Sequence, residues 1–554
     1  MNSEKTSRRR ASVFQPVMFA LVLVVGVFIG STMSKGDVFI FEDNRSGNAN
    51  KLVSVIDYID DYYVDEVKKE DIIENAIATV LEDLDPHSYY ISSEEYKSVH
   101  ERMEGNFEGI GVEFMIRNDS LMVVSALEGG PSLRSGIKPG DRIVKVDGKE
   151  ISGPELNNEK VMTLLKGVSG SEVELGIDRA KEELNFTIKR EAIPIYSVVA
   201  GFTVAEDVGY VKIVRFARRT HEEFVEAVDK LREEGAKKII MDLRSNGGGY
   251  LEPATRMVEE FLERGELIVY TQGRSAGEDR IVSTHNGKYR DLDIVVLMDQ
   301  GSASASEVVA GALQDHDRSI IIGRRSFGKG LVQNEKPLSD DSAIRLTVAR
   351  YYTPTGRCIQ KPYGDGIEYG DDYTRRYESG ELMHRDSIHV ADSLKYTTEG
   401  GRTVYGGGGI VPDIFVPLDT IGSSAYLSQI LYSGLVREFA FSYSDEYREM
   451  LEGFGDYKTF DKDFDISLEM LEELTSLAAD QDIPMDRKQF NHSADVLSIR
   501  LKAQIAKNIF EDEAYYYVAL ADDPEFIKAL EVIRDYNRFF LAGLAEEKAG
   551  VLAQ

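Results

Sequence analysis

Apolar and polar positions follow several different periods along this chain of 554 residues. Between residues 51 and 84, apolar side chains recur every three or four positions, which predicts two amphipathic helices. From residue 107 to 127 the period shortens to two, which predicts a hairpin that turns at Asn118 and Asp119. Two further strand patterns and one helical pattern complete a compact domain, at residues 173–177, 184–190 and 157–167.

Longer apolar segments replace this alternation after residue 195. Five of them predict strands, at residues 208–216, 237–243, 267–272, 294–298 and 319–323. Segments with helical spacing lie between them, at residues 221–235, 252–265 and 307–316. Strands and helices that alternate in this way predict an α/β core with a mostly parallel sheet. Beyond about residue 420 the pattern becomes helical again and rich in Asp and Glu.

The N-terminus carries an export signature. Three consecutive arginines at residues 8–10 precede an apolar run of 18 residues, 16–33. That order is typical of a secretory signal or of a membrane anchor whose arginines stay in the cytoplasm. No clear small-x-small cleavage site follows the run, so the pattern favours an uncleaved anchor over a removed signal. In either case we expect the chain after Gly36 to be exported.

Charge and cysteine content narrow the function classes. The chain has 65 Lys and Arg against 96 Asp and Glu, which gives a formal net charge of −31. This balance argues against a nucleic-acid partner, because a phosphate-binding surface needs clustered basic residues. Cys358 is the only cysteine, so no intramolecular disulfide can form. The cysteine content therefore does not indicate whether the protein works in an oxidising or a reducing compartment.

A serine-rich segment, SASASE at residues 302–307, directly follows a predicted buried strand and begins a predicted helix. A serine nucleophile needs a base for its proton and a pair of N–H groups for the tetrahedral oxyanion. The N–H of Ala305 and the N-terminal end of the following helix would serve an oxyanion formed beside Ser304. The glycine turn DLRSNGGG, with Gly248 and Gly249, is a second source of such an N–H group.

The base for such a serine is less evident from the residues. His316 lies 12 positions after Ser304 on one predicted helix, about 18 Å away, and cannot reach it. His87 follows a helix-stopping proline, for which we expect a structural hydrogen bond, and no other histidine has a partner motif for a Ser-His-Asp triad. Lys329 stands between two glycines, where burial would lower its pKa and make it a base. A lysine in such a turn is otherwise an ordinary surface residue.

Two motifs in the first β-rich domain resemble those of PDZ domains. They are GIGVEF, which begins at Gly109, and GIKPGDRIVKVDG, which begins at Gly136. The resemblance implies that the loop of Gly109, Ile110, Gly111 and Val112 offers backbone N–H groups to the terminal carboxylate of a peptide. The peptide would then add to the domain as a further strand. A purely structural role for the loop is the alternative.

The remaining motifs resemble the carboxy-terminal processing proteases, also called tail-specific proteases. The shared motifs are SASASE, GKGLVQ, DLRSNGGGYLEPA, RLTVARYYTPTGR and GGGGIVPDIFV, and the resemblance covers roughly residues 50 to 420. It implies that Ser304 is the nucleophile, Lys329 the general base and Gln333 the group that orients the lysine. It also implies that Ala305, with Gly248 or Gly249, donates to the oxyanion. Gly247 stands where relatives often have proline. Ser302 and Ser306 do not align with the nucleophile position of the family. We expect them to be helix-entry residues, with Ser306 a candidate N-cap.

The same resemblance implies a crotonase-like α/β serine protease core with an inserted PDZ domain and helical terminal regions. The expected segments are a signal or anchor at 1–36, a helical region at 48–104, the PDZ domain at 105–192, the protease core at 193–420 and an acidic helical domain at 421–554. We expect an exported, membrane-tethered serine endopeptidase of the periplasm or cell envelope that binds free protein C-termini and needs no metal or cofactor. The acidic helical domain is expected to mediate self-association, bind an adaptor or cover the site.

Two other functions fit the residues less well. A PDZ scaffold that has lost proteolysis would not need Ser304, Lys329 and Gln333 together. A hydrolase of small acyl substrates would not need a PDZ domain. Cleavage of an unstructured protein would distinguish these functions from an endopeptidase.

Overall fold

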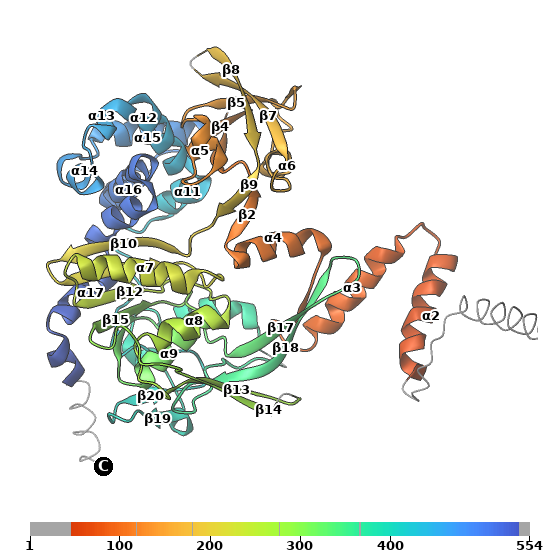
Figure 1. Ribbon diagram of the computed structural model, residues 1–554, viewed down its shortest axis with the longest axis vertical. Coiled ribbons are helices and arrows are strands. Elements are labelled where there is room, and N and C mark those ends of the chain that lie inside the picture. The colour runs from red at the N-terminus through yellow and green to blue at the C-terminus, as the bar shows by residue number, and fades with distance from the viewer. Residues whose placement is uncertain (1–45, 118, 180, 276, 365–366, 542–554) are drawn as a thin grey trace, which may run out of the picture. The chain divides into compact units, whose positions relative to one another are not determined.

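The computed structural model describes residues 46–117, 119–179, 181–275, 277–364 and 367–541 (Figure 1). The chain divides into two compact units, Met1–Thr79 and Val80–Gln554, which are described separately. The first unit contains α2 (Ser46–Tyr62) and most of α3 (Lys69–Glu82), which confirms the two predicted helices. The predicted apolar segment 16–33 lies outside the described residues. Among those described, no helix has the length and apolar character needed to cross a membrane.

A six-stranded sheet forms the centre of the second unit. Its spatial order is β10-β11-β12-β15-β16-β21, in which β10 is antiparallel to β11 and all other neighbours are parallel. The strands are β10 (Val198–Ala205), β11 (Val208–Ile213), β12 (Lys238–Asp242), β15 (Asp293–Met298), β16 (Ser319–Gly323) and β21 (Ile414–Phe415). The predicted mostly parallel sheet is therefore confirmed. The carboxyl ends of its parallel strands meet at one edge, where ligands usually bind in α/β sheets.

Both faces of this sheet are covered, which explains the continuous apolar runs in the sequence. The covering helices are α7 (Thr220–Glu233), α8 (Leu251–Glu259) and α9 (Ala305–Asp315) on one face and α17 (Pro524–Arg534) on the other. Met241 and Val296 belong to the apolar cluster of the first face, whereas Ile240 and Val295 belong to that of the second. Neighbouring residues of one strand thus point into opposite layers, as the alternation of side chains along a strand requires.

An antiparallel second sheet packs against the helices of the first face. Its strands in spatial order are β1 (Tyr89–Ile91), β18 (Ala343–Tyr352), β13 (Leu267–Gly273) and β14 (Gly277–Val282), and β17 (Leu331–Pro337) also pairs with β18. Ile268 and Val269 of β13 and Tyr351 of β18 join the apolar cluster that contains α8 and α9. The segment 267–272, which the sequence rhythm grouped with the parallel strands, therefore belongs to a separate sheet.

Residues 106–194 form a small β domain. The predicted hairpin is present as β3 (Val112–Arg117) and β4 (Ser120–Ala126), with Asp119 at φ 56° in its turn. The other elements are β2 (Asn106–Gly109), α5 (Pro131–Ser135), β5 (Arg142–Val146), β6 (Lys149–Glu150), α6 (Asn158–Leu165), β7 (Glu172–Arg179), β8 (Glu182–Lys189) and β9 (Glu191–Pro194). β3 stands at one end of the order β3-β4-β5-β7-β8, so no strand that the structure describes pairs with its outer side.

The C-terminal region is helical, as the sequence predicts. Its helices are α11 (Ala425–Ser433), α12 (Leu435–Glu446), α13 (Arg448–Glu452), α14 (Tyr457–Asp463), α15 (Leu468–Asp480) and α16 (Arg487–Ala519), and they share one apolar cluster. α16 is interrupted at Phe510 and Glu511, where the backbone leaves the helical conformation. After this kink, Tyr516, Tyr517 and α17 pack on the central sheet. The region beyond residue 421 therefore contributes to two separate apolar clusters.

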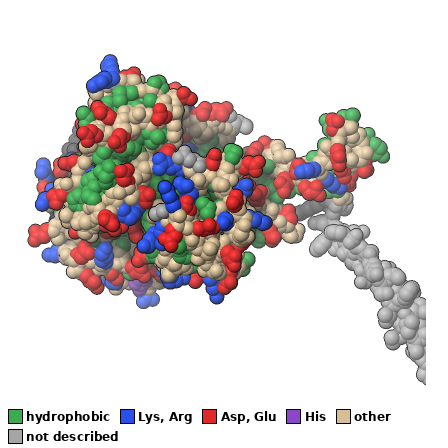
Figure 2. All heavy atoms as spheres, turned by 90° about the horizontal axis from the view of Figure 1, so that it is seen from above, with side chains coloured by type: hydrophobic (Ala, Val, Ile, Leu, Met, Phe, Trp, Pro, Cys, Tyr) green, Lys and Arg blue, Asp and Glu red, His purple; other side chains and the backbone are tan. Residues whose placement is uncertain are grey.

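Short elements complete the described chain. They are α4 (Ser93–Glu104), α10 (Asp372–Glu378), β19 (Lys395–Thr397) and β20 (Thr403–Tyr405). Figure 2 shows acidic side chains scattered over the visible face with Lys and Arg among them. Such a mixture is typical of a solvated acidic surface, and the absence of a nucleic-acid partner stays a prediction.

Candidate active site

Three turns meet at the carboxyl edge of the central sheet. They follow β12, β15 and β16 and carry the predicted glycine, serine and lysine segments, respectively. Backbone hydrogen bonds tie the turns together. Ala303 N–H donates to Asn246 O at 3.0 Å, and Phe327 N–H donates to Ser302 O at 2.9 Å. Candidates that are far apart in sequence therefore share one edge of the sheet, as expected for parallel strands.

Ser304 is the N-cap of α9 and adopts a strained backbone conformation, with φ 56° and ψ −113°. Such a conformation costs a non-glycine residue on the order of 1–3 kcal/mol, so surrounding contacts must hold it. The helix N-terminus at Ser304 carries a partial positive charge that favours an anion there. Ser306, the predicted candidate cap, instead donates its hydroxyl to Asn246 O at 2.9 Å, because it already lies inside the first turn. That prediction is wrong.

A buried carboxylate joins the serine turn to the lysine loop. Glu307 Oε2 accepts the N–H groups of Ser304 and Lys329, each at 2.8 Å. Glu307 Oε1 accepts from Ser326 Oγ at 2.5 Å and from Gly328 N–H at 2.7 Å. Because both N–H groups contact the same oxygen, the backbones of Ser304 and Lys329 lie side by side. Glu307 is fully buried, and burial raises its pKa although the four donors oppose this shift.

Lys329 is half-buried, and a residue of β17 orients its side chain. Lys329 Nζ donates to Gln333 Oε1 at 2.8 Å, and Gln333 Nε2 donates to the backbone oxygen of His87. Burial lowers the pKa of Lys329 below its ordinary value, and the positive charge of Arg345 lowers it further, while nearby carboxylates act in the opposite direction. The structure thus brings Lys329 and Gln333 into contact and provides the desolvation that a lysine base requires.

The glycine turn contacts the serine turn directly. Gly248 has φ 93°, and a Cβ at this position would lie 2.8 Å from Ser304 Cβ and 2.9 Å from Ala305 N. Glycine is therefore required by space as well as by conformation. Gly248 N–H donates to Asn246 Oδ1 at 2.9 Å, whereas the N–H groups of Gly249 and Ala305 donate to no residue that the structure describes. Of the three predicted oxyanion donors, two have no hydrogen-bond partner among the described residues and one is engaged.

The histidines do not supply an alternative base. His87 Nε2 lies 2.8 Å from Tyr369 Oη, which confirms its expected structural hydrogen bond. Burial lowers the pKa of His87 to about 4, with the charges of Lys329 and Lys361 adding to the shift, so its ring is neutral at pH 7. His316 Nε2 binds a backbone oxygen of β13 at 2.6 Å. No histidine that the structure describes hydrogen-bonds to Ser304.

Sequence reasoning missed three groups of this site. They are the carboxylate of Glu307, the backbone oxygen of His87 and the side chain of Asn246. Glu307 lies three residues after Ser304, which is the spacing of a capping box and the one signal that pointed to it. Asn246 belongs to the predicted glycine turn DLRSNGGG, but nothing in that pattern indicated a role for its side chain. His87 belongs to a segment with no helix or strand periodicity, so no pattern linked its backbone oxygen to the candidates.

The predicted carboxylate loop connects β2 and β3 of the small β domain. Gly109 ends β2 and Val112 begins β3. Gly111 has φ 72°, which favours glycine at this position. The N–H groups of Ile110 and Gly111 donate to no residue within the described part of the chain. The loop thus presents two N–H groups next to the open edge of β3, the arrangement that a peptide carboxylate requires.

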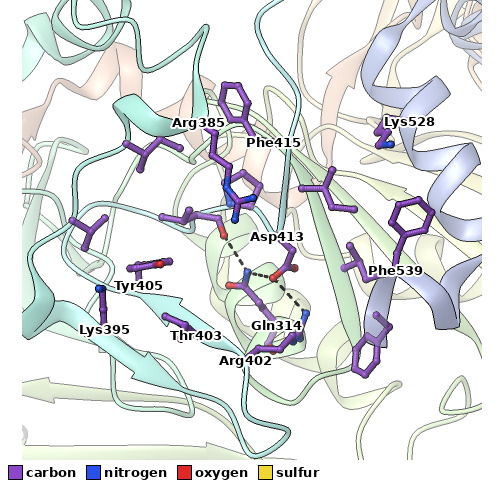
Figure 3. Close-up of a pocket in the computed structure, with 17 residues that line it drawn as sticks. Gln314, Arg385, Lys395, Arg402, Thr403, Tyr405, Asp413, Phe415, Lys528 and Phe539 are labelled. Carbon is purple, nitrogen blue, oxygen red and sulfur yellow. Dashed lines mark hydrogen bonds and ion pairs between the residues drawn. The ribbon is translucent and has the colours of Figure 1, made fainter. Parts of the chain in front are cut away.

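A cavity of about 640 Å³ lies elsewhere in the second unit (Figure 3). Its lining includes Arg402, Asp413 and Gln314, which bind one another: Asp413 Oδ1 accepts from Gln314 Nε2 at 3.1 Å and lies 3.4 Å from Arg402 Nη1. None of the predicted site residues lines this cavity. Because these polar groups satisfy one another, we assign the cavity no part in the chemistry.

Comparison with known families supports the sequence motifs. The sequence model of peptidase family S41 matches residues 207–369, and that of the PDZ domain matches residues 109–189. A family of unknown function, DUF8443, matches residues 426–511. The S41 match contains the glycine, serine and lysine turns, and the PDZ match contains the carboxylate loop.

Individual proteins with related sequences are also known. The carboxy-terminal-processing protease of Bartonella bacilliformis is 36% identical over 353 residues, which cover 61% of this chain and 80% of that protein. A probable CtpA-like serine protease of Staphylococcus aureus is 33% identical over 374 residues, which cover 66% of this chain and 73% of that protein. Among solved structures, the photosystem II D1 C-terminal processing protease has 28% identity and a TM-score of 0.31, with 55% of this chain and 88% of that chain covered.

Proposed function

The chain belongs to peptidase family S41, as a carboxy-terminal-processing serine peptidase with a PDZ domain, and we propose that Ser304 and Lys329 form its catalytic dyad. The observation that supports this most strongly is the single oxygen of Glu307, which binds the N–H groups of both residues. Burial lowers the pKa of Lys329, so its neutral form is available at lower pH than that of a free lysine. Gln333 orients the amine from β17.

The proposed reaction begins with proton transfer. Neutral Lys329 accepts the hydroxyl proton of Ser304 while Ser304 Oγ attacks the carbonyl carbon of the scissile peptide bond. The carbonyl electron pair moves onto oxygen, and this oxyanion binds the N–H groups of Ala305 and of the glycine turn. The open donor of that turn is Gly249, and Gly248 becomes a donor once its N–H leaves the side chain of Asn246.

The acyl-enzyme then forms and breaks down. Protonated Lys329 gives its proton to the leaving amine, the C–N bond breaks, and an ester remains on Ser304. Neutral Lys329 next takes a proton from water, whose oxygen attacks the ester and releases the new C-terminus. The proton returns to Ser304 Oγ, so the dyad is regenerated without a metal or cofactor.

PDZ domains bind C-terminal peptides, and we propose that this one holds the end of the substrate. Support comes from the N–H groups of Ile110 and Gly111, which have no partner among the described residues, and from the open edge of β3. A bound chain end would add to β3 as a strand, and the same chain would be cut upstream at Ser304. Binding through the free carboxylate makes the enzyme selective for chain ends.

The location of the protein is a proposal from its sequence. We propose export and retention at the cytoplasmic membrane, because arginines at 8–10 precede the apolar run 16–33. The substrates would then be exported proteins of the periplasm or cell envelope. Self-association or adaptor binding by the C-terminal helices stays a prediction.

Cleavage of an unstructured protein tests this function. The purified chain should convert casein with a free C-terminus into fragments that mass spectrometry identifies, and Ser304→Ala and Lys329→Ala should each abolish them. Lys336→Ala is the matched control, because Lys336 is an exposed lysine on the same strand as Gln333. Fragments that persist in Ser304→Ala would contradict the proposed nucleophile, and a wild type without any cleavage would favour a non-catalytic scaffold.

A further inference from the structure

A buried arginine, Arg324, and a partly buried one, Arg244, lie directly behind the catalytic turns. Arg244 comes two residues after the end of β12 and opens the glycine turn, whereas Arg324 directly follows β16 and precedes Lys329 by five residues. Arg324 also reaches the serine turn, since its Nε donates to Gln300 Oε1 at 2.8 Å. Arg324 N–H donates to Met298 O at 3.1 Å. The two guanidinium groups are therefore connected to all three turns of the proposed site.

The first turn of α17 supplies the carboxylates that bind these arginines. Asp523, the N-cap, accepts from Arg244 Nη1 at 2.7 Å through Oδ2, and Glu525 Oε2 accepts from the same nitrogen at 3.0 Å. Glu525 Oε1 also accepts from Arg324 Nη1, so one carboxylate bridges the two arginines. Glu525 is 5% exposed, and Arg324 is also 5% exposed. Ion pairs this well shielded from water restrict the geometry of their partners much more than surface pairs do.

The packing of α17 explains why these carboxylates stand at the catalytic edge. Phe526, Ala529, Val532 and Ile533 are buried in the apolar cluster on the second face of the sheet. Figure 1 shows α17 alongside β12 and β15, and the helix also contacts β16. Its N-terminus thereby points to the edge where the three turns begin. Negative charge at this end also suits the helix dipole.

The two arginines differ in the number of other carboxylates with which they form ion pairs. Arg244 also pairs with Asp242 of β12, with its Nη2 2.5 Å from Asp242 Oδ2. For Arg324, Glu525 is the one carboxylate within ion-pair distance among the residues that the structure describes. Loss of the Glu525 charge would therefore leave Arg324 buried without a counter-charge and force it to move. A displaced Arg324 would also displace the lysine loop, to which it belongs, and Gln300, to which it donates a hydrogen bond.

We propose that Asp523 and Glu525 are positioning residues, which hold the glycine, serine and lysine turns in register for catalysis. This inference rests on the proposed dyad of Ser304 and Lys329. It assigns a part in the protease to a helix that lies outside all three sequence-family matches, 109–189, 207–369 and 426–511. The helix acts through Arg244 and Arg324 and does not contact the substrate.

Steady-state kinetics together with covalent labelling test the proposal. We would measure kcat and KM on a peptide with a free C-terminus, and the rate at which a fluorophosphonate labels Ser304, which does not depend on peptide docking. Glu525→Gln should lower kcat at least tenfold and the labelling rate by a similar factor, with KM within about twofold of wild type. Glu525→Asp keeps the charge and should recover part of the loss. Asp523→Asn should lower both rates only severalfold, because Arg244 still forms its ion pair with Glu525.

Glu531→Gln is the matched control. Glu531 lies on α17, is exposed, and pairs only with Lys528 at 2.8 Å among the described residues, so its neutralisation should leave all rates within twofold of wild type. All rates are measured well below the unfolding temperature of each variant. A Glu525→Gln protein that unfolds more easily but keeps kcat and the labelling rate would overturn the proposal, since the carboxylate would then serve stability alone.

Two outcomes separate this proposal from the dyad on which it rests. Labelling that persists in Ser304→Ala would overturn the dyad assignment. Specific labelling of Ser304 with equal rates in wild type and Glu525→Gln would overturn the positioning role alone. If Glu525→Gln does not fold, Asp523→Asn decides: unchanged labelling in that variant overturns the proposal, and a severalfold loss supports it.

Discussion

Replacement of Glu307 by glutamine would test the tie between the nucleophile and the base. Glu307 accepts four hydrogen bonds, from Ser304, Lys329, Ser326 and Gly328. Glutamine keeps one acceptor oxygen and replaces the other by an NH₂ group, which donates. With the NH₂ group at the Oε2 position, the N–H groups of Ser304 and Lys329 both lose their acceptor. With the NH₂ group at the Oε1 position, only the N–H of Gly328 does, because the hydroxyl of Ser326 can turn and accept from the amide.

The size of the effect follows from these contacts. A hydrogen bond to a charged group contributes about 1.5–3 kcal/mol, so one or two lost bonds amount to about 1.5–6 kcal/mol. About 1.4 kcal/mol corresponds to a factor of ten, so a loss confined to the catalytic turns would reduce the active population on the order of 10- to 10⁴-fold. The change also removes a charge that raises the pKa of Lys329. The residual activity should therefore reach its midpoint at lower pH than in wild type.

The assay is kcat/KM on a fluorogenic peptide with a free C-terminus, measured from pH 6 to 10 beside a circular dichroism spectrum. Glu307→Gln should retain its helical and strand signals while losing at least about tenfold in kcat/KM. Glu233→Gln, at an exposed carboxylate in the last turn of α7, is the control and should match wild type. A Glu307→Gln enzyme with activity within threefold of wild type would refute the reasoning.

Three further outcomes are expected. Gln333→Ala should lower kcat about tenfold, less than loss of Lys329, because the base remains but loses its hydrogen bond at 2.8 Å. A substrate with an apolar free C-terminus should be cut faster than its amidated twin at subsaturating concentration, because we propose that the loop at 109–112 binds the terminal carboxylate. The full-length protein should stay with membranes through a high-salt wash and keep its native N-terminus, because the apolar run 16–33 is the proposed anchor.

Each of these expectations has an outcome that would contradict it. Wild-type kinetics in Gln333→Ala would show that the lysine needs no orientation. Equal cleavage rates for the free and amidated substrates would exclude the carboxylate loop from recognition. A soluble protein whose N-terminus lies near Gly36 would identify the apolar run as a cleaved signal.

Local pattern predicted four of the six strands of the central sheet, β11, β12, β15 and β16, because these buried strands are continuous apolar runs. The strand that ends at Met298, the helix that begins at Ala305 and the turn at Gly248 all follow from short stretches of sequence. The hairpin around Asp119 was equally clear. The strand at 267–272 was different, because its composition does not reveal which of two sheets it joins.

The contacts that hold the site together depend on tertiary structure. Glu307 is an acidic residue in the first turn of a helix, and only the fold shows that it binds Lys329, 22 positions later. Asp523 pairs with Arg244 across 279 positions, a separation at which sequence periodicity carries no information. The family resemblance suggested the roles of Ser304 and Lys329, whereas the groups that position them required the structure.

The pH dependence of Ser304 acylation in wild type, measured beside Lys329→Ala, tests the central claim most directly. In the proposed dyad the neutral amine of Lys329 is the active form, and burial lowers the pKa of Lys329 from the ordinary value of 10.5. The acylation rate of wild type should therefore increase with pH through an apparent pKa below 10.5. Lys329→Ala should lose at least about 10²-fold at every pH, the usual contribution of a positioned general base. A Lys329→Ala enzyme that acylates Ser304 within about tenfold of wild type would contradict the dyad.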